Sequence, residues 1–280
     1  MNKPALRHLS LLLFALLFAG CATSATRAPG KIPARSLLEP DALRVLAWNL
    51  GTAEMSAGTL DDDNVEIVVE TLEMVKADVV LLQSVSDPDQ ATQIVEMLTD
   101  RGVPYVSVHT KADPDRPDAL LVTLFGGSQG EARTWQSSEG YGILSVPAKG
   151  MLVINVHGPH RWAPARNRFF REAATWAAEH KGVVVMGGSF SVDPEGRQRA
   201  LWFSWPGRDR STFRLIRNAF PVGTEVGPTT SQEWALDHIR ARFARVVVQA
   251  RLEGHRQGAM SHDPILAEIA PLLTRPGLPP

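Results

Sequence analysis

The segment Val185-Met186-Gly187-Gly188-Ser189-Phe190-Ser191 places two serines directly beyond a short apolar run. The run follows Gly182 and is rich in valine, which predicts a buried β-strand over residues 183–186. Ser189 and Ser191 therefore stand at the end of a strand, where a rigid scaffold can present polar side chains to a ligand. What stands at the other strand ends decides how this segment is interpreted.

Strands and helices alternate on both sides of this segment. Other apolar runs predict strands near residues 44–49, 78–84, 105–108, 119–125, 142–146, 151–156, 236–240 and 243–252. A helix is predicted over residues 64–76, where valines and leucines recur with the helical period. Two more are predicted, one capped by Asp87 or Asp89 and ending at Gly102, the other from about Pro164 to His180. Strands covered by helices predict a layered α/β sandwich.

Polar residues stand in six short motifs in a defined order along the chain, five of them at predicted strands. They are Trp48-Asn49, Leu82-Gln83-Ser84, Val156-His157-Gly158, Gly188-Ser189-Phe190-Ser191, Leu236-Asp237-His238-Ile239 and Ser261-His262-Asp263-Pro264. The series spans almost the whole domain and resembles the endonuclease/exonuclease/phosphatase superfamily, also called DNase I-like. That superfamily has strands ending in Asn, Leu-Gln-Glu, His and Gly-Asp-Phe-Asn, followed by Asp-x-Ile and Ser-Asp-His-x-Pro. The resemblance implies a four-layered α/β sandwich, with two central β-sheets flanked by helices.

Four positions of the superfamily's catalytic site are retained. Asn49 matches the Asn that helps to position the metal, and His157 matches the His that donates to the phosphate. Asp237 matches the Asp that orients the last His, and His262 fills that His position. The alternative for each of these four residues is a purely structural role, with a hydrogen bond that stabilises the fold.

Four other positions are degenerate. Ser84 replaces the metal-ligating Glu, Ser189 the Asp that activates water, Ser191 the Asn that contacts phosphate, and Ser261 the Asp before the last His. Three of these losses remove a carboxylate, and a neutral hydroxyl supplies no charge to offset the dehydration of Mg²⁺. Loss of a general base alone costs about 10²–10⁴-fold in rate. The resemblance therefore implies an impaired enzyme with no resident cofactor.

Other acids could restore a metal site. Asp87, Asp89, Asp193 and Asp263 lie just beyond the degenerate motifs. Helix capping is the simpler role for the first two, and Asp193 precedes a proline that shapes its loop. Asp263 would need a bulge, because a one-residue shift in an extended segment turns a side chain to the opposite face. If such a rearrangement exists, the expected cofactor is Mg²⁺ or Mn²⁺.

The N-terminus predicts export. Residues 1–20 combine Lys3 and Arg7 with an apolar run too short to span a bilayer stably. Residues 17–21 resemble the lipobox of bacterial lipoproteins, cut before Cys21, the only cysteine of the chain. Ala22 favours the outer membrane of a Gram-negative bacterium, with the domain in the periplasm. We expect a lipid-anchored Cys21, a flexible tether over residues 21–41, one domain over residues 42–272 and a tail over residues 273–280.

Charge limits the choice of partner. Without the signal peptide, 27 basic residues face 30 acidic residues, a balance that does not favour nucleic acid. Basic residues gather between residues 161 and 220, either as a solvated face or as a local anion site with Arg161 and Arg166 as candidate ligands. A phosphate-containing ligand is therefore the expected small partner.

Three functions follow from this sequence. The preferred one is a lipid-anchored envelope protein, a pseudoenzyme that uses a phosphoesterase fold for binding or as a scaffold. The alternatives are an active divalent-metal-dependent phosphodiesterase, phosphatase or nuclease with rearranged ligands, and a purely structural envelope lipoprotein.

Overall fold

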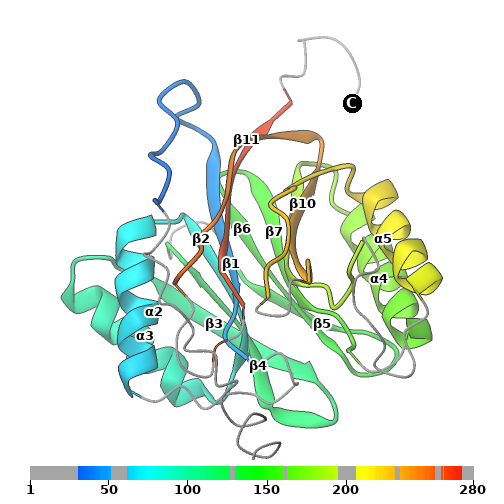
Figure 1. Ribbon diagram of the computed structural model, residues 1–280, viewed down its shortest axis with the longest axis horizontal. Coiled ribbons are helices and arrows are strands. Elements are labelled where there is room, and N and C mark those ends of the chain that lie inside the picture. Colours follow the sequence, from blue (N-terminus) through cyan, green and yellow to red (C-terminus); the bar gives the residue numbers. More distant parts are fainter. Residues whose placement is uncertain are drawn as a thin grey trace, which may run out of the picture.

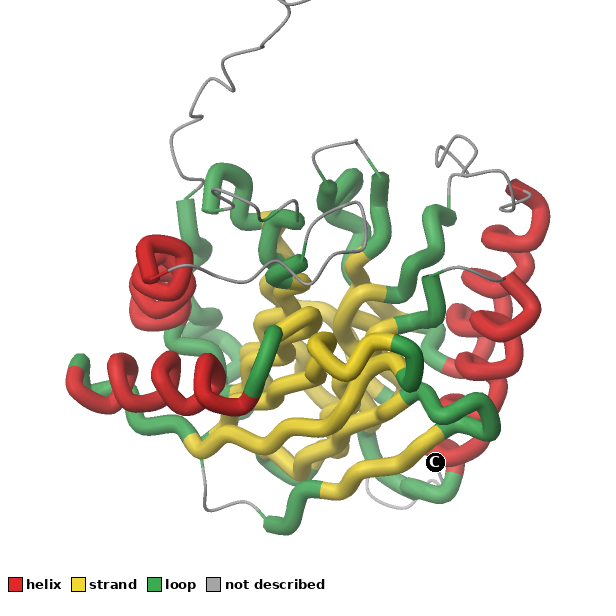
Figure 2. Tube along the Cα trace, turned by 90° about the horizontal axis from the view of Figure 1, so that it is seen from below, coloured by secondary structure: helices red, strands yellow, loops and turns green. Residues whose placement is uncertain are grey.

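The structure is a computed structural model that describes residues 31–51, 62–126, 130–160, 163–194, 206–230, 234–255, 260 and 262–272. Twelve strands and four helices occur within these ranges. Two six-stranded β-sheets pack face to face, with a pair of helices on each outer face (Figures 1 and 2). The predicted four-layered α/β sandwich is confirmed.

The first sheet has the strand order β11-β12-β1-β2-β4-β3. Its strands are β1 (Leu43–Asn49), β2 (Val79–Val85), β3 (Val106–Asp113), β4 (Arg116–Phe125), β11 (Ala244–Arg251) and β12 (Ile265–Pro271). Only β1 and β2 pair in parallel, and the other neighbours are antiparallel. Both central strands are fully buried, as their uninterrupted apolar runs predict.

The second sheet has the strand order β5-β6-β7-β8-β10-β9. Its strands are β5 (Arg133–Gln136), β6 (Gly142–Ala148), β7 (Met151–His157), β8 (Val184–Ser189), β9 (Val222–Gly223) and β10 (Asp237–Arg242). Strands β6 and β7 form the predicted antiparallel pair, and β7 and β8 run in parallel.

The helices cover the two outer faces. They are α2 (Asp62–Val75), α3 (Pro88–Asp100), α4 (Ala163–Ala178) and α5 (Pro206–Ala219). The apolar stripe of α2 is buried against the first sheet, together with α3. Asp87 caps α3, since its Oδ1 accepts a hydrogen bond from the backbone N–H of Gln90 at 2.8 Å. The pair α4 and α5 covers the second sheet, and α5 has no counterpart among the predicted elements.

Strand pairing brings the motif residues to one end of the sandwich. Asn49 pairs with Gln83 across β1 and β2. Ser189 pairs with His157 on one side and with Asp237 on the other. A buried polar contact joins the two sheets nearby, where Gln83 Nε2 donates to Asn155 Oδ1 at 2.8 Å. The ends of β1, β2, β7, β8 and β10 are thus held in a fixed relation to one another.

Several expectations concern residues outside the described ranges: the signal peptide of residues 1–20, Cys21, the tail of residues 273–280, Arg161 and Ser261. Residues 31–41, expected as part of the tether, contact the domain through Arg35, which bonds the carboxylate of Asp78. Within the part of the chain that the structure describes, no helix is long and apolar enough to cross a bilayer.

Candidate functional site

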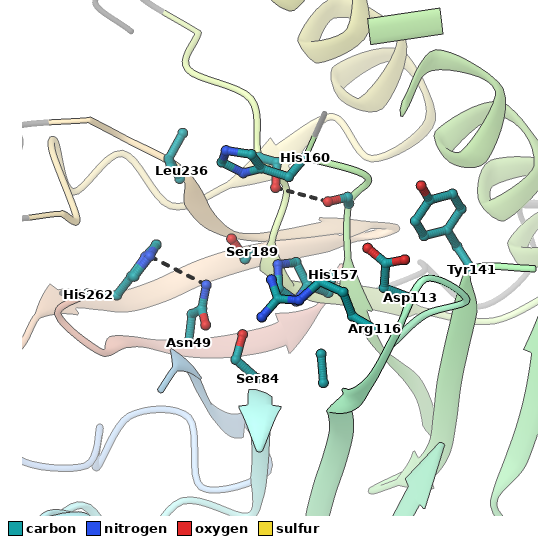
Figure 3. A pocket seen from close by; sticks show the side chains of 13 residues that line it. Asn49, Ser84, Asp113, Arg116, Tyr141, His157, His160, Ser189, Leu236 and His262 are labelled. Atoms are coloured by element: carbon teal, nitrogen blue, oxygen red, sulfur yellow. Dashed lines mark hydrogen bonds between the residues drawn. The ribbon is translucent and has the colours of Figure 1, made fainter. Parts of the chain in front are cut away.

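A small cleft lies where the motif-bearing strand ends meet. It has a volume of about 40 Å³, room for about three water molecules. Its lining includes six positions singled out in the sequence: Asn49, Ser84, His157, Ser189, Ser191 and His262. Figure 3 labels all of these except Ser191 and shows them converging from both sheets. The structure therefore brings these six residues together from distant parts of the chain.

Ser84 is aimed at the cleft by an irregularity in β2. The pairing of β2 with β4 shifts register between Gln83 and Val85, and Ser84 between them has φ 59°. A bulge of this kind re-aims a side chain at the end of a strand. Left-handed backbone is uncommon for serine and is strained relative to glycine.

The Gly188–Ser191 segment has a similarly constrained backbone. Gly188 has φ 133°, and a Cβ at this position would lie 2.1 Å from the carbonyl oxygen of Val156. Only glycine fits there, which explains this residue of the motif. Ser191 has φ 52°, and its Oγ donates to the carbonyl of Gly158 at 2.9 Å. The backbone around Ser189 and Ser191 is thus closely constrained.

Asp237 and His262 form the expected pair. Asp237 Oδ2 lies 2.6 Å from His262 Nδ1, and it also accepts a hydrogen bond from Thr229 Oγ1 at 2.7 Å. Burial by itself raises the pKa of Asp237. The charge of His262 and the hydrogen bonds from His262 and Thr229 outweigh burial, so the pKa lies below its usual value. The carboxylate is therefore ionised at neutral pH.

Asn49 fixes the other side of the His262 ring. The backbone N–H of Gly51 donates to Asn49 Oδ1 at 3.0 Å, which leaves Asn49 Nδ2 to face His262 Nε2 at 3.4 Å (Figure 3). Nδ2 can only donate, so the amide presents a donor to the ring nitrogen that does not face Asp237. His262 is thus held between an amide and a carboxylate.

His157 differs from His262 in having no such partners. Its ring is partly exposed to the cleft, and no described residue forms a hydrogen bond with it. Burial, with the charges of His160 and His262, lowers the pKa of His157 to about 3. The ring is therefore neutral near pH 7, with one N–H available to a ligand.

Four polar lining residues were missed in the sequence, namely His160 and the group of three formed by Asp113, Arg116 and Tyr141. Asp113 ends β3, Arg116 begins β4, and the two pair across the tight turn of this hairpin. Figure 3 shows all three on the side of the cleft where His157 lies. They also line an adjoining groove of about 410 Å³, which extends the cleft toward α4. Arg116 is the cation that lines both cavities.

Arg166 is not an anion ligand, contrary to the expectation from sequence. It is 2% exposed and forms an ion pair with the buried carboxylate of Asp209. Its Nη1 also donates to the carbonyls of Pro159 and His160, at 3.3 and 3.2 Å. Arg166 itself does not line the cleft, and its bonds support the loop after β7.

The donor set of the cleft does not fit a divalent cation. Mg²⁺ and Mn²⁺ prefer carboxylate oxygens, which offset the cost of dehydration. The cleft floor offers hydroxyls, one amide and imidazoles, and the amide oxygen of Asn49 already accepts from Gly51. Asp113 is the only carboxylate among the described lining residues, and it stands beside the cation Arg116. Nowhere in the described ranges do three His, Cys, Asp or Glu side chains form a group that could hold a metal ion.

The acids considered as replacements do not line the cleft either. Asp87 caps α3, and Asp89 is exposed in the first turn of that helix. Asp263 is buried, with its Oδ2 3.9 Å from Arg251 Nε. Asp193 is buried near Asp209, whose pKa it helps to raise. None of the four supplies the missing charge.

Comparison with known proteins supports the fold. No protein-family model matches the sequence, and no curated protein matches it. Among solved structures, an endonuclease/exonuclease/phosphatase family protein from Leptotrichia buccalis aligns with a TM-score of 0.61 at 11% identity, over 82% of this chain and 100% of that chain. The endonuclease/exonuclease/phosphatase from Bacteroides vulgatus aligns with a TM-score of 0.60 at 14% identity, over 82% and 99%.

A mannosyl-6-phosphatase from Bacteroides thetaiotaomicron aligns with a TM-score of 0.59 at 13% identity, over 81% of this chain and 99% of that chain. Identities this low establish the fold alone. The chain has the DNase I-like fold of the endonuclease/exonuclease/phosphatase proteins.

Proposed function

We propose that this chain is a lipid-anchored envelope protein that binds an anionic, phosphate-containing ligand in its cleft and does not hydrolyse it. The observation that carries the proposal is the cleft floor, where Ser84, Ser189 and Ser191 stand among an amide and two imidazoles. Hydrolysis of a phosphoester needs a base for water and charge to stabilise the reacting oxygens. The cleft floor supplies neither a carboxylate base for water nor the carboxylates that would hold a metal ion.

Binding of an anion needs only positive charge and hydrogen-bond donors, and the cleft retains both. Arg116 supplies a permanent positive charge, and neutral His157 supplies an N–H donor. The hydroxyls of Ser84 and Ser189 form no hydrogen bond with any described residue, so both can donate to an oxyanion. Partial burial strengthens each of these interactions relative to water.

The ligand that fits is larger than a phosphate ion. The adjoining groove begins at Arg116 and Tyr141 and continues to Glu139 and Arg168. An anionic group at Arg116 would leave the rest of the ligand beside Tyr141 and the carboxylates of the groove. Those carboxylates and the phenol accept hydrogen bonds from hydroxyl or amino groups. A phosphorylated polyol or amino alcohol fits this arrangement, with its phosphate at Arg116 and its hydroxyl or amino groups in the groove.

A second function has one observation in its favour. Asp113 lines the same cleft as Asn49, His157 and His262, so a metal ion could be bound at a shifted position with this carboxylate as its charged ligand. That arrangement would make the chain an active divalent-metal-dependent phosphoesterase. Arg116 disfavours it, because a cation next to Asp113 competes for the carboxylate and repels the metal.

Thermal unfolding tests the two functions side by side. A ligand that binds only the native state raises the melting temperature, by about 2.7 kcal/mol of stabilisation at a hundred times its dissociation constant. We expect inorganic phosphate and glycerol phosphate to raise the melting temperature, with sodium chloride at equal ionic strength as the control. We expect no hydrolysis of bis(p-nitrophenyl) phosphate with Mg²⁺ or Mn²⁺. Metal-dependent turnover that His262→Ala abolishes would overturn the proposal, and so would the absence of protection by any phosphate compound.

A further inference from the structure

The end of the sandwich opposite the cleft carries the exposed large hydrophobic side chains of the described residues. Leu37 and Leu38 are 94% and 91% exposed. The others are Met74, Val106, Phe243 and Leu272, between 46% and 55% exposed. We call these six residues the apolar end. Scattered single hydrophobic residues are ordinary on a protein surface, whereas a group of them at one place marks an interaction site.

Strand register places all six at the same end. Across the first sheet, Val106 of β3 pairs with Phe125 of β4, and Phe125 also pairs with Val79 of β2. Val79 in turn pairs with Val45, near the start of β1. The backbone N–H of Leu272 bonds the carbonyl of Phe243 just beyond the ends of β12 and β10.

The remaining three are tied to the same place. Leu37 and Leu38 precede β1, and Met74 lies in the last turn of α2. Just after that helix, the backbone N–H of Asp78 donates to the carbonyl of Arg44, at the start of β1. Figure 1 shows residues 31–42 and the end of β12 at the top and the β3–β4 hairpin at the bottom. The cleft residues occupy the other ends of the same strands.

The loop that carries the two leucines is held rigidly. The N–H of Ser36 donates to Glu268 Oε2 at 3.0 Å, and Glu268 is itself bonded to the buried Arg44 at 2.6 Å. Lys149 Nζ donates to the carbonyl of Ala42 at 3.0 Å, and Arg245 forms an ion pair with Glu39. The backbone on both sides of the leucines is therefore fixed. A rigid loop that presents apolar groups loses little conformational entropy when it meets a surface.

We propose that the apolar end rests on the membrane to which the chain is anchored, so that the cleft faces away from that membrane. This inference rests on the proposed lipid at Cys21. Nine residues separate Cys21 from Lys31, so the anchor lies at most about 36 Å from the start of the described chain. Ile32 and Arg35 border a groove with Met74 at the apolar end. The start of the described chain and the apolar side chains thus lie on one side of the domain.

The charges around the apolar end are mixed, and Asp41 is an exposed acid there. Acidic side chains there would be repelled by anionic headgroups. Asp78 is paired with Arg35 and Lys149, and Glu39 is paired with Arg245. Two leucines that enter the headgroup boundary add apolar burial to the affinity of the lipid anchor.

The proposal also limits the ligand. Strand β1 runs from the apolar end to Asn49 over seven residues, a length of roughly 20 Å. A cleft held at that height on the far side of the domain cannot reach headgroups of the anchoring membrane. Its ligand is then a water-soluble phosphate compound, or one presented by a structure that faces this membrane.

Site-specific fluorescence on the full chain tests the orientation. A lipidated Cys21 has no free thiol, so a single introduced cysteine is the only site for a thiol-reactive dye. We would label Leu38→Cys at the apolar end and, as the matched control, Asp115→Cys, an exposed residue in the β3–β4 turn. The lipoprotein is reconstituted in vesicles of equal parts phosphatidylethanolamine and phosphatidylglycerol that contain a quencher-bearing lipid.

We expect strong quenching of the dye at position 38 and little at position 115. In the Leu38→Cys background, Leu37→Ser should lower the quenched fraction, because a buried leucine is worth about a tenfold change in partition. Quenching at position 115 alone, or equal quenching at both, would overturn the orientation, as would quenching at neither. Failure of the lipid anchor gives a different result, because the wild-type chain would then react with the dye at Cys21 and would not co-float with vesicles.

Discussion

Replacing Asp237 by Asn tests whether the retained Asp–His pair stabilises the fold in the absence of catalysis. The substitution keeps the shape of the side chain and removes its charge. Asp237 is 2% exposed, and its Oδ2 lies 2.6 Å from His262 Nδ1 and 2.7 Å from Thr229 Oγ1. Both contacts are therefore shielded from water, and each is a hydrogen bond to an ionised acceptor.

The expected loss of stability is about 2 kcal/mol. A hydrogen bond to a charged group contributes about 1.5–3 kcal/mol and a neutral one about 0.5–1.5 kcal/mol, so two bonds lose about 1 kcal/mol each. The pKa of Asp237 lies below its usual value, because its bonds to His262 and Thr229 and the charge of His262 outweigh burial. This contribution to stability is complete above the unfolded pKa of about 3.9 and disappears as the pH falls through the lower folded pKa.

Urea unfolding, followed by tryptophan fluorescence, measures the difference. Wild type should exceed Asp237→Asn by about 2 kcal/mol at neutral pH with an unchanged m-value, and the gap should close below about pH 4. The control Asp115→Asn, at an exposed carboxylate, should change stability by less than about 0.5 kcal/mol. The reasoning is refuted if Asp237→Asn behaves like this control, or if the gap is the same at about pH 3 as at about pH 7.

Two further substitutions probe the cleft. Arg116→Gln should raise the dissociation constant for phosphate, measured by protection against thermal unfolding, about tenfold or more, because it removes the charged donor. The control Arg171→Gln, on the exposed face of α4, should leave that constant unchanged. Equal effects of the two substitutions would argue against Arg116 as the ligand. Gly188→Ala should destabilise by about 3 kcal/mol or more in urea unfolding, since its Cβ would meet the Val156 oxygen at 2.1 Å. Gly150→Ala has a positive φ but no atom within 4 Å of its Cβ, so its cost should be only about 1 kcal/mol; a similar cost at Gly188 would contradict the packing described.

The sequence was sufficient for the layers and the cleft floor because both depend on local patterns. The buried strands β1, β2 and β8 are uninterrupted apolar runs, and the polar residues that end them must meet at one edge once the sheets form. The helical period of α2 and the capping role of Asp87 were equally readable. Asn49 and His262 line one cleft although 213 positions separate them.

The remaining features depend on contacts that no local pattern reveals. Residues 109–118 contain two prolines and several charges and were not predicted as strand. Pairing with β4 nevertheless extends β3 as far as Asp113, and this hairpin delivers Asp113 and Arg116 to the cleft. The role of Arg166 was wrong because its partner, Asp209, lies 43 positions away, on a helix that was not predicted. Charge density alone could not distinguish a buried ion pair from an anion site.

The most direct test of the central claim is a calorimetric titration of Mn²⁺ into the full chain, combined with the same titration of Asp113→Asn. The account holds that the serines at positions 84 and 189 leave the cleft without the charge that a divalent cation needs. It therefore predicts no saturable binding to either protein. Saturable binding of one ion to wild type that is lost in Asp113→Asn would contradict the account and establish a relocated metal site.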